Sequence, residues 1–196
     1  MDYSKHYTDG WVGMEQAVRL GLARSIGVSN FNERQIEDIL LRCYIKPSVN
    51  QIESHPMLTV SKVIDWCQTR GIQITAYSPF ANPGNALAPT DSDKYPKPLQ
   101  DERIKAIAAK YPGKTPGHVI LRWQIQRGVA VIPKSTSPER LKANLNVFDF
   151  HLTPEDMETI NGMDKGIRMC AFCMFGNSSH RDYPYDEYRD KEDPFA

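Results

Sequence analysis

The sequence predicts an α/β fold built on a parallel β-sheet. Four short apolar stretches have the length and composition of β-strands. Each is followed by one or two segments in which apolar side chains recur every three to four residues, as on one face of an amphipathic helix. Strands that alternate with helices pair in parallel through right-handed crossovers. Two architectures fit: an open doubly wound sheet, although its usual G-x-G-x-x-G turn is absent from the sequence, and a section of a (β/α)8 barrel, which normally needs about 250 residues.

The predicted strands are short apolar segments bounded by turn residues and helices. They cover residues 25–29, 48–52, 72–76 and 129–132. The chain opens on a helix, because Trp11, Met14, Val18 and Leu22 share a helical face that ends near Gly21. The first strand then follows this helix.

Residues whose side chains cap free backbone amides mark the starts of the later helices. One such signal is Asn32 with Gln35 three residues later, and the others are Thr59, Asp101, Thr115–Pro116, Ser137–Pro138 and Thr153–Pro154. Residues 81–100 are rich in Pro, Gly, Asn and Asp and are too long for a routine connection, so they are predicted to form a flap. Beyond Gly166 the periodicity fades into an aromatic, proline-containing tail.

The composition argues against several classes of partner. The formal net charge is zero and the basic residues are scattered, so neither a nucleic acid nor an anionic membrane is expected to bind. No apolar run approaches the roughly 20 residues that span a bilayer, and the amino terminus lacks the apolar core of a signal peptide, so a cytoplasmic location is expected. Cys170 and Cys173 have metal-ligand spacing but lack a second ligand pair, so reduced thiols and no metal are expected.

Polar side chains follow every predicted strand, at the edge where chemistry collects in parallel α/β folds. These residues are Ser29 and Asn30, then Asn50, Gln51 and Glu53, then Tyr77, Ser78 and Pro79, and finally Lys134, Ser135 and Thr136. Ser, Asn and Gln side chains suit an amide, and Tyr77 offers a flat face to a planar ring, which together favour an amide-bearing aromatic ligand. Ordinary capping and loop hydrogen bonds are the alternative explanation.

The stretch VIPKSTSPER, residues 131–140, favours a bound phosphate. A strand leads into Lys134, three hydroxyl residues and a helix start, with Arg140 one turn inside the helix. Free amides and the helix dipole favour an anion at such a place. The alternative is a capped helix with solvated charges, and the stretch alone fits a sugar phosphate as well as a dinucleotide.

Five motifs together resemble the aldo-keto reductase family, close to its aldose and aldehyde reductase branch. They are GVSNFN at 27–32, VNQIESHP at 49–56, TAYSPF at 75–80, RIKAIAAKY at 103–111 and VIPKSTSPERLKAN at 131–144. The resemblance implies a partial (β/α)8 TIM barrel that corresponds to strands five to eight of the family, with its helices and carboxyl-terminal loop. It further implies the family activity, NADPH-dependent reduction of aldehydes and ketones to alcohols.

The resemblance assigns NADP(H) to the strand-end residues. Ser29, Asn30 and Gln51 would hold the nicotinamide carboxamide, and Tyr77 would stack on its ring. The pyrophosphate path would be lined by Ser78, Phe80 and Asn82, beneath the flap at 81–100. The 2′-phosphate would be held by Lys134, Ser135, Thr136 and Arg140, and the adenine by Asn144, although this chain has Ala143 where close family members carry Glu.

Cys170 and Phe172 would lie in the family's substrate-pocket loop. The predicted organisation is an amino-terminal extension at 1–10, an NADP(H)-binding half-barrel at 11–166 and a substrate-loop-like tail at 167–196. No motif in the sequence matches the family's catalytic Asp, Tyr, Lys and His, so no catalytic residue is assigned.

Three hypotheses follow from this resemblance. The first is a truncated reductase that retains the NADP(H) groove without independent catalysis. The second is one part of a complete reductase, with the other half supplied upstream or in trans, which would then take a small carbonyl substrate. The third is an interaction fragment that self-associates through open barrel edges.

Overall fold

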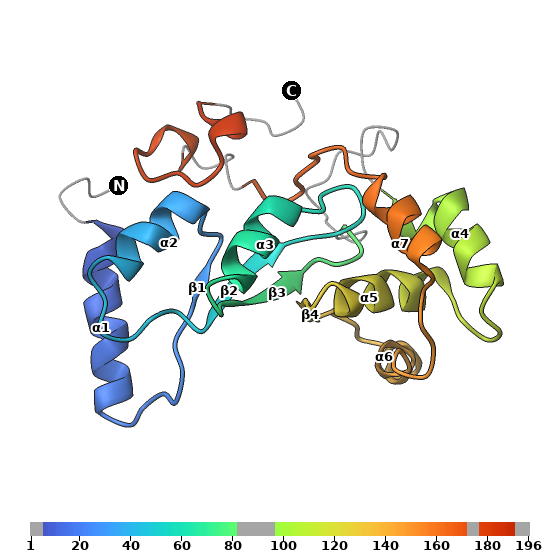
Figure 1. The fold of residues 1–196 in the computed structure, drawn as a ribbon, viewed down its shortest axis with the longest axis horizontal. Helices are drawn as coiled ribbons and strands as arrows, with labels where there is room; N and C mark the ends of the chain where they lie inside the picture. Colours follow the sequence, from blue (N-terminus) through green and yellow to red (C-terminus); the bar gives the residue numbers. More distant parts are fainter. Residues whose placement is uncertain (1–5, 82–96, 172–176, 191–196) are drawn as a thin grey trace. The chain divides into compact units, whose positions relative to one another are not determined.

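The computed structural model describes residues 6–81, 97–171 and 177–190 of the chain (Figure 1). These residues fall into two compact units. The first unit comprises the described parts of 1–52, 61–74 and 170–196, and the second comprises 53–60 and the described parts of 75–169. The chain passes between the units within strands β2 (Val49–Glu53) and β3 (Gln73–Tyr77), and again between residues 60 and 61 and between residues 169 and 170.

The first unit holds a parallel strand pair and three helices. Strand β1 pairs with β2 so that Val28 lies opposite Asn50 and Ser29 opposite Gln51. Trp11 packs with Ile26 and Ile39, and its indole N–H donates to the Ile45 carbonyl at 3.0 Å. The elements are α1 (Tyr7–Arg19), β1 (Val28–Ser29), α2 (Glu33–Leu40), α3 (Ser61–Gln68) and the 3-10 turns η3 (Asn177–Ser179) and η4 (Asp186–Tyr188).

The second unit holds the other parallel pair and the larger core. Strand β3 pairs with β4 so that Thr75 lies opposite Ala130 and Ala76 opposite Val131. Helices α4, α5 and α7 bury one apolar cluster, in which the indole of Trp123 is fully buried and donates to Asn161 Oδ1 at 2.8 Å. The elements are η1 (Pro98–Gln100), α4 (Glu102–Ala109), α5 (Pro116–Gln126), β4 (Ala130–Val131), α6 (Pro138–Leu145) and α7 (Pro154–Asn161).

The sheet order is β1-β2-β3-β4, so the strands follow one another in chain order. This order and the two parallel ladders confirm the predicted α/β class with a parallel sheet. The predicted capping residues Asn32, Asp101, Thr115, Ser137 and Thr153 all accept a hydrogen bond from the first turn of their helices. Local cap chemistry therefore located these helix starts correctly.

Three predicted elements differ from the structure. The buried strand predicted at 25–29 is reduced to Val28–Ser29, and Ser29 is exposed. Helix α3 begins at Ser61, two residues after the predicted cap Thr59, whose hydroxyl donates to Asp164. Helix α1 begins at Tyr7, ahead of the predicted helical face that starts at Trp11, because His6 and Asp9 form a capping box there.

Asp156 links helices α4 and α7 and is expected to make stability depend on pH. Burial acts to raise the pKa of this carboxyl, but hydrogen bonds from Lys110 at 2.5 Å and from Tyr111 outweigh it and hold the pKa below its usual range. A depressed folded-state pKa contributes stability above the unfolded value near 4, and this contribution is lost as pH falls through the lower folded value.

We therefore expect Asp156→Asn to lower the free energy of unfolding at pH 7 by about 1.5–3 kcal/mol, the usual range for hydrogen bonds to a charged group. The difference between variant and wild type should shrink as pH falls below about 4. Urea unfolding at both pH values measures this. Glu158→Gln, at an exposed position on the same helix, is the control, and a loss that is equal at both pH values would contradict the assignment.

Candidate functional site

A pocket in the second unit brings together most of the residues predicted to hold a cofactor. Its volume is about 320 Å³, which lies within the range of small-ligand sites. The predicted residues that line it are Ser78, Phe80, Lys134, Ser135, Thr136, Arg140 and Asn144. Pro79, Leu99 and Ile132, which the sequence did not assign to the cofactor, complete the wall.

The segment between β4 and α6 forms one side of this pocket. Ser137 is the N-cap of α6, and its hydroxyl oxygen accepts from the Arg140 amide at 3.2 Å. Ser135 Oγ accepts from the Ser137 amide at 3.1 Å. Pro138 occupies the first helical position and has no amide hydrogen to offer.

The backbone amides predicted to attract an anion are thus largely used within the loop. The pKa of Glu139 lies below its usual range, because the Ser137 hydroxyl donates to its carboxylate at 2.6 Å and its own backbone amide also contributes. An anion in this pocket would therefore depend on side chains more than on the helix amides.

Lys134 and Arg140 supply the positive charge. Both side chains are exposed and both line the pocket. Within the described residues, no carboxylate forms a salt bridge with either of them. Two cations without such partners, beside the hydroxyls of Ser135 and Thr136, match the donor set that a phosphate requires.

The other end of the pocket begins where strand β3 ends. Tyr77 is the last residue of β3 and is half-buried. Ser78 and Ala81 have φ of 47° and 57°, a left-handed conformation that is uncommon for residues other than glycine. The Ala81 amide donates to the Ser78 carbonyl at 2.8 Å, which closes this turn and places Ser78 and Phe80 on the pocket wall.

The three residues predicted to hold a carboxamide meet in the first unit. The Ser29 hydroxyl and the backbone N–H of Asn30 both donate to the backbone carbonyl of Gln51, each at 2.9 Å. Asn30 has a φ of 60°, which is tolerated by Asn more readily than by most residues. The ladder between β1 and β2 therefore gathers Ser29, Asn30 and Gln51 at one place.

Several predicted features lie outside the described residues. These are Asn82, Phe172, Cys173 and most of the predicted flap at 81–100. Cys170 is described and is half-buried in the first unit. In the part of the chain that the structure describes, no three His, Cys, Asp or Glu side chains form a metal-binding group, and no helix is long and apolar enough to cross a membrane.

Comparison with known proteins decides the family. The family model for the aldo/keto reductases matches residues 1–165. The chain belongs to the aldo/keto reductase family. The resemblance drawn from the sequence motifs is thereby confirmed.

Among curated aldo/keto reductases, the chain is similar to family 1 member A1 from Gallus gallus, with 42% identity over 95% of this chain and 58% of the relative. It is 42% identical to member A1 from Homo sapiens over 84% of this chain and 50% of the relative. The chain thus spans about half the length of the curated relatives it matches.

Solved aldo/keto reductases share the fold. A structure complexed with NADPH gives a TM-score of 0.86 at 37% identity, over 95% of this chain and 55% of the other. A Bombyx mori aldo/keto reductase in complex with NADP gives 0.82 at 40% identity, over 92% and 57%. These similarities confirm the α/β fold of the family, and both neighbours were solved with the cofactor that the sequence motifs predict.

Proposed function

We propose that this chain binds NADP(H) and that the pocket of the second unit takes the 2′-phosphate of the adenosine. The observation that carries the proposal is the presence of Lys134 and Arg140, without salt bridges to described carboxylates, beside Ser135 and Thr136 in one pocket. A dianionic phosphate would supply the negatively charged partner for these two cations. NADPH carries this phosphate and NADH does not.

The remaining cofactor assignments follow the geometry of each unit. Asn144 would contact the adenine from the same pocket, and Ser78 and Phe80 would lie along the pyrophosphate. In the first unit, Ser29, Asn30 and Gln51 would bind the carboxamide, which needs both donors and acceptors. Tyr77 would stack on the nicotinamide ring, and Asn82 would extend the pyrophosphate contacts.

We infer that the chain corresponds to strands five to eight of the family barrel and has no turnover by itself. Bound NADPH would supply a hydride to a carbonyl, and the oxygen that gains charge must then receive a proton from an acid group. The sequence offers no motif for the family's catalytic Asp, Tyr, Lys and His. The shares of 58% and 50% of the relatives' lengths agree with a half of such a protein.

The second candidate function is one part of a complete reductase, and an exposed apolar face in the second unit favours it. Helix α6 buries no residue, and β4 stands at the end of the sheet order. Outside the pocket wall, the apolar side chains exposed in this part of the chain are Leu141 at 47%, Leu145 at 75% and Phe148 at 68%. A companion half-barrel would cover these side chains. It would also pair with the open edge of the sheet at β4, whose backbone groups otherwise have no partner strand among the described residues. A second copy of this chain is the alternative occupant.

The experiment that tests the absence of catalysis is a turnover assay on the purified chain saturated with NADPH. With an aldehyde added, we expect no loss of NADPH absorbance beyond the rate without protein. Turnover at a rate proportional to protein would contradict the absence of catalysis in the chain alone. Sedimentation of the same sample identifies dimers, which would favour the third hypothesis if NADPH does not bind.

Tyr77 provides a test of the nicotinamide end. We expect Tyr77→Ala to weaken NADPH binding by about tenfold, since stacking on a ring contributes about 1 kcal/mol or somewhat more. Binding of adenosine 2′-phosphate, which lacks the nicotinamide, should be unchanged. Calorimetric titration of both ligands measures this, and an equal loss for the two would show that Tyr77 acts on the fold and not on the ring.

A further inference from the structure

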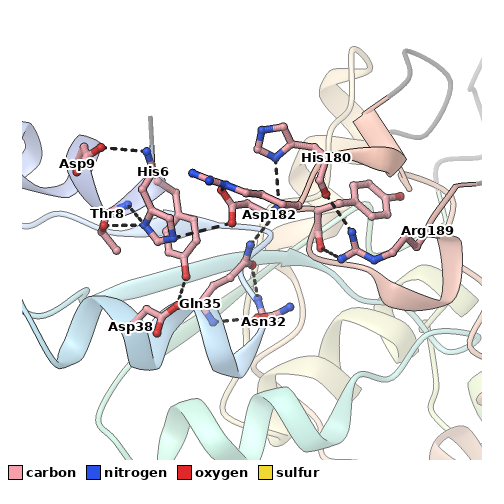
Figure 2. Close-up of polar contacts among 12 residues, drawn as sticks. His6, Thr8, Asp9, Asn32, Gln35, Asp38, His180, Asp182 and Arg189 are labelled. Carbon is pink, nitrogen blue, oxygen red and sulfur yellow. Dashed lines mark hydrogen bonds and ion pairs between the residues drawn. The ribbon is translucent and has the colours of Figure 1, made fainter. Parts of the chain in front are cut away.

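In the first unit, the C-terminal segment 180–189 contacts the start of helix α2 through two amide side chains (Figure 2). Asn32 Nδ2 donates to the Pro184 carbonyl at 3.1 Å. Gln35 Nε2 donates to the Asp182 carbonyl at 2.7 Å. Gln35 is 3% exposed, so its polar end depends on this partner rather than on water.

The same two side chains form the capping box of α2. Asn32 Oδ1 accepts from the Gln35 amide at 2.9 Å, and Gln35 Oε1 accepts from the Asn32 amide at 3.1 Å. Each side chain therefore uses its oxygen for the helix and its NH₂ group for the C-terminal segment. Asp and Glu would serve the cap equally well but have no donor, so the helix alone does not require amides here.

The segment held in this way reaches back to Cys170. The Tyr183 hydroxyl donates to the Ala171 carbonyl, and Ala171, Tyr183, Tyr185 and Tyr188 form a buried cluster. Arg189 donates to the Tyr183 carbonyl at 3.1 Å, which keeps the segment folded on itself. Tyr183 lies between the two residues whose carbonyls accept from Asn32 and Gln35, so its hydrogen bond to Ala171 links these contacts to the residue next to Cys170.

We propose that Asn32 and Gln35 are positioning residues for the C-terminal segment and that they act through Tyr183 to place Cys170. The inference goes beyond the proposed function, and only the expected place of Cys170 in the substrate-pocket loop comes from the family resemblance. His6 Nε2 also approaches Asp182 Oδ1 at 3.9 Å, but this pair is partly exposed and contributes less. We call the two hydrogen bonds from the Asn32 and Gln35 side chains to the Pro184 and Asp182 carbonyls the clamp.

The double variant Asn32→Asp, Gln35→Glu separates the clamp from the cap. It keeps both acceptors of the capping box and adds negative charge at the helix N-terminus, which favours the helix. It removes both donors and sets carboxylates against the carbonyls of Asp182 and Pro184. We expect iodoacetamide to alkylate Cys170 faster by on the order of tenfold, from the loss of two hydrogen bonds.

Peptide mass spectrometry reads each cysteine separately and provides the internal control. Cys67 is buried and burial raises its pKa to about 11, so its slow alkylation should not change while the fold is intact. Hydrogen exchange should show lost protection in 180–189 and retained protection in α2. Arg34→Ala, an exposed change on the same helical turn, should leave Cys170 and the segment as in the wild type.

Two results would overturn the proposal. One is an unchanged alkylation rate at Cys170 with the segment still protected. The other is a parallel loss of protection in α2, which would mean that the two residues only support their own helix. NADPH affinity, measured on the same variant, should equal that of the wild type. A wild-type chain that binds no NADPH would refute the proposed cofactor without altering the result at Cys170.

Discussion

Replacing both Lys134 and Arg140 with alanine is expected to weaken NADPH binding by about 10²-fold and to leave NADH binding nearly unchanged. Both side chains line the pocket of the second unit, and neither has a salt bridge within the described residues. Hydrogen bonds between ionised partners contribute about 1.5–3 kcal/mol each, and 1.4 kcal/mol corresponds to tenfold. We choose the lower end, because both residues are exposed and their charges are screened by water and salt.

Lys142→Ala is the matched control for this experiment. Lys142 lies on the same helix and is exposed, but it does not line the pocket. We expect the control to change the affinity for NADPH less than threefold, as an exposed charge outside a site usually does. If the double variant lost affinity for NADPH and NADH equally, the two cations would not hold the 2′-phosphate.

Trp123→Ala is expected to lower the free energy of unfolding by about 3–5 kcal/mol. The side chain is fully buried in the cluster formed by α4, α5 and α7, and its indole N–H bonds to Asn161 Oδ1. Removing it leaves a large cavity and an unpaired acceptor. Since small domains are stable by only about 5–15 kcal/mol, this loss is a large share of the total.

Urea unfolding measures the loss, with Trp66→Ala as the control. Trp66 is half-buried on α3, and the Arg70 guanidinium lies 3.8 Å from its ring centroid. Such a cation–π pair near the surface contributes about 1 kcal/mol or less. Trp66→Ala should therefore lower the free energy of unfolding much less than Trp123→Ala does. Equal effects of the two substitutions would contradict the core assigned to the second unit.

Helix starts could be predicted from the sequence because a cap depends on residues two or three positions apart. Asn32, Thr115, Ser137 and Thr153 all bond to amides in their own first turn. Helix α3 begins at Ser61, and the hydroxyl of the predicted cap Thr59 donates to Asp164, more than a hundred positions along the chain. A local pattern cannot reveal such a distant partner.

The shortness of β1 was also hidden from the sequence pattern. A side chain on Gly27 would place its Cβ 2.6 Å from the Val49 carbonyl oxygen, so glycine permits a close approach of the two backbones there. Only Val28 and Ser29 then pair as regular strand residues. The apolar composition of 25–29 indicated a strand but not where the ladder ends.

The pocket was predictable where its residues are contiguous, as in the stretch from Lys134 to Arg140. Ser78 and Phe80 joined it because strand ends in a parallel sheet meet at one edge. Leu99 was not singled out, although it lies near the end of the flap predicted at 81–100. The second bonds of Asn32 and Gln35 could not be foreseen either, because their partners lie about 150 positions away.

The preference of this chain for NADPH over NADH tests the assignment of the pocket most directly. Titration of the purified chain with NADPH and, separately, with NADH, followed by fluorescence at constant salt, tests it. We predict saturable binding of NADPH with an affinity at least tenfold above that for NADH, as one bound phosphate implies. Equal affinities, or no binding of NADPH, would contradict the assignment of the pocket.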